Sequence, residues 1–126
     1  MSHCKGTNCM TKLKIDNPLL EAIEDFAFGA NGNLKTVEMG ENPSLRIYKE
    51  GVFLNSPVED IIITKNLTTI GNRNFVRNNN VKAKSVTVYG DNPLRFNSDW
   101  QRIGLINNGN NNCPVIPDGE NSVTCS

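Results

Sequence analysis

The sequence predicts an α/β-type repeat solenoid, in which short parallel strands alternate with irregular or short helical returns. Apolar residues and an asparagine recur at the spacing L-x-x-L-x-L-x-x-N, seen most completely in residues 34–45. The spacing returns 24 residues later, from Val58, and also occurs 24 residues earlier, from Met10. A looser copy begins at Ala83. Recurrence at one fixed period is the signature of a repeat architecture.

Each copy opens with residues that alternate between apolar and polar side chains. This period of two predicts a strand with one buried face. The inward positions are expected to be Leu13 and Ile15, Val37 and Met39, Ile61 and Ile63, and Val86 and Val88. Because a crossing segment separates successive strands, they should pair in parallel.

The segments between the strands also resemble one another. In the first two copies an Asn-Pro turn, at Asn17 and Asn42, is followed eleven residues later by a phenylalanine. We therefore expect Phe28, Phe53 and Phe75 to stack along the side of the core opposite the strands.

The repeats define the predicted organisation of a single small domain. Residues 1–9 are the remnant of an N-terminal cap, residues 10–105 carry about four repeats, and residues 106–126 form an Asn-rich tail or a disulfide-closed cap. The predicted units are 10–33, 34–57, 58–82 and 83–105.

Composition excludes partners that need a strong overall charge. Thirteen basic residues balance thirteen acidic ones, so no global field attracts nucleic acid or an anionic membrane. The sequence contains twenty asparagines, a residue that suits turns and left-handed backbone. No run approaches the roughly 20 apolar residues of a membrane span.

The four cysteines lie at the two ends of the chain. We predict a bridge between Cys113 and Cys125, because the polar tail needs a covalent tie to offset its ordering entropy. Cys4 and Cys9 form either a small disulfide loop or two free thiols. Disulfides indicate an oxidising compartment. The first residues lack the apolar core of a signal peptide, so we expect the numbered chain to lack a true N-terminus.

No catalytic, metal or cofactor site is predicted. The single histidine, His3, lies in the terminal segment and, with Cys4 and Cys9, supplies at most three zinc ligands. The adjacent carboxylates Glu24 and Asp25, like Glu59 and Asp60, should be solvated, because neighbours on a strand point to opposite faces. A basic cluster contains Arg73, Arg77, Lys82 and Lys84, and we interpret it as a solvated loop rather than a nucleic-acid site.

Over about residues 10–105 these motifs resemble the leucine-rich-repeat family. The form Leu-x-x-Ile-x-x-x-x-Phe in residues 20–28 and 67–75 is similar to secreted animal leucine-rich-repeat proteins and to BspA-like surface proteins of bacteria and protists. The resemblance implies a right-handed solenoid whose parallel sheet lines a concave face. It also implies a non-enzymatic, extracellular or cell-surface module that binds a protein partner through that face, without membrane insertion.

In that fold, alternate strand residues would form the concave binding face. They are Lys12, Lys14, Asp16, Thr36, Glu38, Gly40, Asp60, Ile62, Thr64, Ser85, Thr87 and Tyr89. Ile62 should project to solvent, either as an anchor with Tyr89 or simply as a β-branched residue that suits a strand. The alternative function is an accessory or structural subunit packed against a catalytic chain or against sister repeats.

One glycosylation sequon with a permitted middle residue occurs, at Asn66-Leu67-Thr68. It coincides with the repeat asparagine, whose side chain should bond backbone groups inside the turn. An asparagine in that role cannot carry a glycan, and we expect Asn66 to have the structural role.

Overall fold

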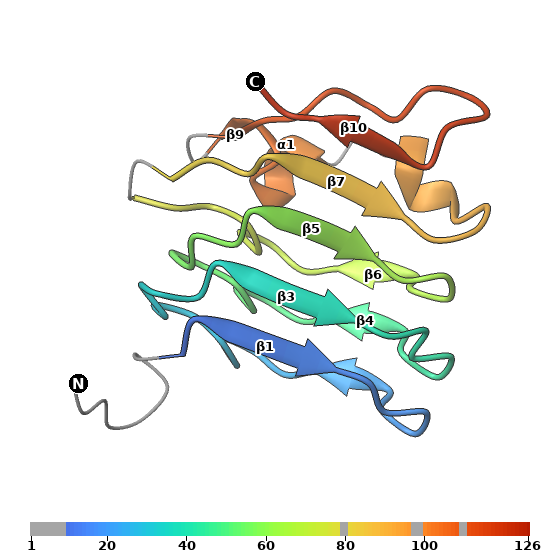
Figure 1. Cartoon of the computed structure of the whole chain (residues 1–126), viewed down its shortest axis with the longest axis horizontal. Helices are drawn as coiled ribbons and strands as arrows, with labels where there is room; N and C mark the ends of the chain where they lie inside the picture. The colour runs from blue at the N-terminus through green and yellow to red at the C-terminus, as the bar shows by residue number, and fades with distance from the viewer. Residues whose placement is uncertain (1–9, 79–80, 97–99, 109–110) are drawn as a thin grey trace.

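The computed structural model describes residues 10–78, 81–96, 100–108 and 111–126, and it shows a β-solenoid (Figure 1). Four strands form a front row: β1 (Lys12–Ile15), β3 (Thr36–Met39), β5 (Asp60–Ile63) and β7 (Ser85–Val88). The parallel register places Lys12 opposite Thr36 and Asp60 opposite Ser85. These are the four strands that the alternating pattern predicted.

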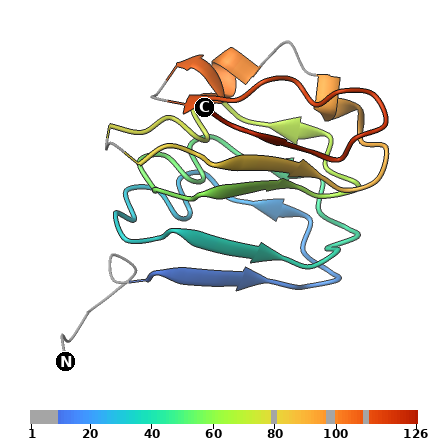
Figure 2. The ribbon, with the colours of Figure 1, turned by 45° about the horizontal axis from the view of Figure 1, so that its top comes forward.

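A second, smaller sheet lies behind the front row (Figure 2). Its strands, β2 (Ala22–Ile23), β4 (Ile47–Tyr48) and β6 (Thr69–Ile70), pair in parallel and form the back row. These three returns are therefore irregular, as expected, apart from the two-residue strand that each contains. Each contains one or two β-branched or aromatic residues, which favour extended backbone. Among the described residues, helical turns occur only in the last return, in η2 (Pro93–Phe96) and α1 (Trp100–Ile103).

The hydrophobic core fills the space between the two rows. The inward front-row side chains of β3, β5 and β7 are all buried, whereas Leu13 of β1 is half-buried. The phenylalanine stack is confirmed: the ring centroids of Phe28 and Phe53 are 5.9 Å apart and those of Phe53 and Phe75 are 6.0 Å apart. Each unit thus buries its apolar side chains against its neighbours.

Buried asparagines satisfy the backbone where the chain leaves the front row. Asn42 donates through Nδ2 to the carbonyl oxygens of Ile15 and Gly40. The Nδ2 of Asn92 contacts three carbonyl oxygens, those of Thr64 (2.8 Å), Lys65 (3.3 Å) and Leu67 (2.8 Å). Because such carbonyls face away from water, a side-chain donor is needed at each corner.

The C-terminal segment is an ordered cap. The predicted disulfide between Cys113 and Cys125 is present. It lies between a short antiparallel pair, β8 (Ile106–Asn108) with β9 (Asn111–Asn112), and a last strand, β10 (Ser122–Thr124). β10 pairs antiparallel with β7 and covers the end of the front row (Figure 1).

The cap also contains a buried side-chain network that the sequence did not reveal. Asn111 accepts a hydrogen bond from the backbone N–H of Ala83 and donates to the carbonyls of Phe75 and Gly104. Ile116 of the same segment is buried in the hydrophobic core. The segment therefore contributes to the core as well as closing it.

Two further expectations concern the N-terminal cysteines and histidine and a membrane-spanning segment. Cys4, Cys9 and His3 lie outside the described residues. Within the described part of the chain, no helix has the length and apolar character needed to span a bilayer.

The corner asparagines provide a test of this architecture. We expect Asn92→Ala to lower the free energy of unfolding by about 2–4 kcal/mol, because it leaves buried carbonyls without a donor. The matched change Asn66→Ala removes one exposed hydrogen bond, to Pro43, and should cost about 1 kcal/mol or less. Urea denaturation of the two variants measures the difference. Equal losses would contradict a special role for the buried corner.

Candidate functional site

The outer face of the front row carries most of the predicted binding residues. This outer face consists of Lys12, Lys14, Thr36, Glu38, Asp60, Ile62, Ser85 and Thr87, which alternate with the buried residues of their strands. The register aligns Lys14 with Glu38 and Ile62 with Thr87 across neighbouring strands. Ile62 is half-buried rather than fully projecting, and it packs partly against the core.

Charges on the outer face neutralise one another locally. The ammonium group of Lys12 lies 2.8 Å from the carboxylate of Glu38, and both side chains are largely exposed. This hydrogen bond and the positive charge of Lys12 lower the pKa of Glu38. Next along the row, the hydroxyl of Ser85 donates to Asp60 over 2.7 Å. The face therefore presents a patterned surface with little net field.

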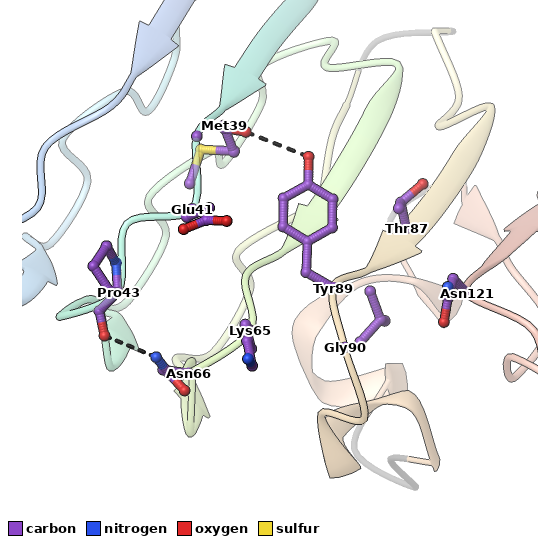
Figure 3. A pocket seen from close by; sticks show the side chains of 11 residues that line it. Met39, Glu41, Pro43, Lys65, Asn66, Thr87, Tyr89, Gly90 and Asn121 are labelled. Atoms are coloured by element: carbon purple, nitrogen blue, oxygen red, sulfur yellow. Dashed lines mark hydrogen bonds between the residues drawn. The ribbon is translucent and has the colours of Figure 1, made fainter.

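Thr64 is the predicted face residue that the structure places elsewhere. It is fully buried, so it cannot contact a partner directly. The backbone N–H of Tyr89 donates to the carbonyl of Ile63, which continues the β5–β7 register and sets Tyr89 beside Thr64. The half-buried Tyr89 side chain then crosses β5 to reach Met39 on β3 (Figure 3). The Tyr89 side chain covers the end of β5, which explains why Thr64 is inaccessible to a partner.

The front row is interrupted between β3 and β5. In the described chain, β1 pairs with β3 and β5 pairs with β7, but no ladder joins the two pairs. Two tyrosine hydroxyls bond backbone carbonyls on either side of the interruption: Tyr48 of the back row donates to that of Ile62 (2.8 Å), and Tyr89 donates to that of Met39 (3.3 Å). Burial raises the pKa of Tyr48, which keeps this hydroxyl protonated as a donor.

A hollow of about 790 Å³ opens beside this interruption, at the carboxyl ends of β3, β5 and β7 (Figure 3). Its lining combines an aromatic ring, hydroxyls, amides and one charge of each sign. The residues are Met39, Gly40, Glu41, Pro43, Lys65, Asn66, Thr87, Val88, Tyr89, Gly90 and Asn121. Concave sites with a few converging polar groups are the usual form of a ligand pocket.

The hollow has few titratable side chains, namely those of Glu41, Lys65 and Tyr89. The lining contains neither histidine nor cysteine, and its carboxylate, Glu41, is exposed. In the described part of the chain, no group of three acidic, histidine or cysteine side chains could hold a metal ion.

Sequence reasoning missed most of the hollow. Thr87 and Tyr89 lie on or next to a strand and were predicted, whereas Glu41, Lys65 and Asn121 lie in connecting segments. A usable signal was present, because the segments that follow parallel strands meet at one edge of the sheet. The alternating pattern identifies side chains on strands and is silent about these loops.

The basic cluster predicted from the sequence is dispersed. Arg77 is buried and donates to the carbonyls of Val58 and Val81, each over 2.9 Å. Burial lowers its pKa to about 10. Arg73 forms an ion pair with Glu50, and Lys84 forms one with Glu59. Arg77 was therefore wrongly assigned to a solvated loop.

Comparison with protein-family models identifies the family to which the chain belongs. The model of the BspA type leucine-rich repeat region matches residues 2–92, in six copies. The chain belongs to the BspA-type leucine-rich repeat family. Neither a curated protein nor a solved structure matches it. Repeats of this family are in general interaction modules without catalytic activity, and BspA-type proteins are typically secreted or on the cell surface.

Paired substitutions distinguish how much the hydrogen bonds of Tyr48 and Tyr89 each contribute to stability. Tyr48→Phe should lower the free energy of unfolding by about 1–3 kcal/mol, because it leaves the carbonyl of Ile62 without its donor next to the core. Tyr89→Phe removes a longer bond at the edge of the hollow and should cost about 1 kcal/mol or less. Thermal denaturation of both variants tests this order. A larger loss for Tyr89→Phe would show that the outer bridge holds the row together.

Proposed function

We propose that the chain is an extracellular, non-enzymatic binding module that recognises a protein partner through the outer face and the adjoining hollow. The observation that carries the proposal is the hollow beside Tyr89, which adds a recessed anchor site to an exposed strand surface. Interfaces gain most of their affinity from a few anchors in such recesses, with aromatic residues prominent among them. The concave β-face of the family fold is the surface on which this site would lie.

Two features support an extracellular setting. The Cys113–Cys125 disulfide is typical of proteins that fold in an oxidising compartment. BspA-type repeats are typically secreted or surface-exposed. With two basic and two acidic side chains, the outer face has balanced charge and suits a partner that is recognised by pattern rather than by net charge.

A charge reversal on the outer face tests the proposal. The chain is immobilised and screened against an array of purified extracellular proteins. For a true partner, Asp60→Lys should weaken binding at least about tenfold, because it places a like charge in the contact. The matched control Glu21→Lys makes the same charge change at an exposed residue outside the front row, and binding should be unaffected. Binders that respond equally to both variants, or an absence of protein binders, would contradict the proposal.

The alternative of an accessory subunit is favoured by one observation. Two large apolar side chains are exposed in the first return, Leu19 at 83% and Phe26 at 47%. Exposed apolar groups that lie close in the chain mark surfaces on which another chain or repeat can pack.

Sedimentation equilibrium tests this alternative. If the first return mediates assembly between copies, the wild-type chain should form dimers or larger species. Leu19→Asp should shift the mass to that of the monomer without changing the melting temperature. A monomeric wild-type chain at high concentration would argue against self-assembly through this return.

A further inference from the structure

The asparagine of the third repeat is more exposed than those of the second and fourth repeats. Asn42 and Asn92 are 1% and 3% exposed, whereas Asn66 is only half-buried and lies at the rim of the hollow (Figure 3). The expectation that Asn66 bonds a backbone group holds, since its Nδ2 donates to the carbonyl of Pro43, but this bond lies at the surface and not inside the turn. Its side chain lies on the surface, between Lys65 and Pro43.

The hydrogen bonds of the amide groups show the same contrast. The Nδ2 of Asn42 donates to two carbonyls and that of Asn92 contacts three, so both N–H groups of each amide are used inside the protein. The Nδ2 of Asn66 makes one exposed hydrogen bond, to the carbonyl of Pro43 over 2.9 Å. One N–H of Asn66 is thus available while the other holds the side chain in place.

The sequence motif and the structure select the same residue. Asn66-Leu67-Thr68 is the sequon with a permitted middle residue, and Thr68 is exposed. At the second repeat, Asn42-Pro43-Ser44 has the spacing of a sequon but is excluded by its proline. That asparagine is also buried. A modifiable motif therefore coincides with a repeat asparagine that the fold leaves accessible, whereas the exposed asparagine of the first repeat, Asn17, has no sequon.

We propose that Asn66 is an acceptor of an N-linked oligosaccharide. In the transfer, Nδ2 forms a bond to the anomeric carbon of a lipid-linked oligosaccharide diphosphate, and the bond from that carbon to the diphosphate breaks. The lipid diphosphate leaves, and one amide proton passes to a base of the transferase. No electrons are exchanged with an oxidant or reductant. The remaining N–H can still donate to Pro43, so the modified side chain keeps its place.

A glycan on Asn66 would stand over the mouth of the hollow. Asn66 lines the hollow together with Tyr89 and Glu41, so a sugar chain leaving its amide restricts access to both. The attachment site rests on the sequon and on the accessibility of Asn66. Its regulatory meaning, as a control on which partners reach the hollow, rests on the proposed function.

Mass spectrometry tests the attachment. The full chain is produced behind a secretion signal in cells that perform N-glycosylation, and the intact mass is measured before and after treatment with a peptide N-glycosidase. We expect an oligosaccharide on the wild-type chain and conversion of Asn66 to aspartate on its removal. Asn66→Gln and Thr68→Val should carry no glycan, whereas Thr68→Ser should retain it. An unmodified secreted wild-type chain, or a glycan that persists in Asn66→Gln, would overturn the proposal.

Chemical accessibility tests the screening of the hollow. The chain has two tyrosines, and Tyr48 is buried, so it serves as an internal control. Nitration of Tyr89 by tetranitromethane should be severalfold slower in the glycosylated wild type than in unglycosylated Thr68→Val from the same cells. Equal rates would overturn the screening effect. Neither measurement requires a partner, so failure of the binding proposal and failure of the glycan proposal give different results.

Discussion

The architecture depends on satisfying backbone carbonyls at the corners where each strand of the front row ends. A flattened solenoid turns sharply there, and the turned carbonyls face the core instead of water. Asn42 and Asn92 solve this with side-chain amides, and Asn111 does the same inside the cap. Only with the corners satisfied can successive units approach closely enough to share Ile63, Val88 and the phenylalanine stack. Three of the twenty asparagines thus have a direct structural explanation.

The hollow follows from the same corners. Parallel strands deliver the segments that follow them to one edge, so polar and charged residues from separate repeats converge there without being close in sequence. The interruption between β3 and β5 adds an aromatic component, since Tyr89 crosses β5 to reach the carbonyl of Met39. The recess therefore lies at one end of the outer face, whose charges balance, and both are formed by the same strands and the segments that follow them.

Strand positions, their register and the Cys113–Cys125 bridge could be predicted because they depend on local periodicity and simple chain connectivity. The back row could not, since two-residue strands such as β4 are too short to show a period. The burial of Thr64 and Arg77 was missed for another reason. Both are decided by neighbours distant in sequence: Tyr89 beside Thr64, and the carbonyl of Val58 for Arg77. Asn66 was assigned to the interior by analogy with its repeat partners, and a pattern cannot show which copy departs from it.

The direction of β10 has a consequence for how the solenoid meets other molecules. Because β10 runs opposite to β7, the surface at this end no longer offers the strand direction on which another repeat could be added. A strand that paired with β10 would meet a strand of reversed direction. The Cys113–Cys125 disulfide holds β10 in place. Among the described strands, the two outer strands of the front sheets thus differ: β1 pairs in parallel with β3, whereas β10 pairs antiparallel with β7.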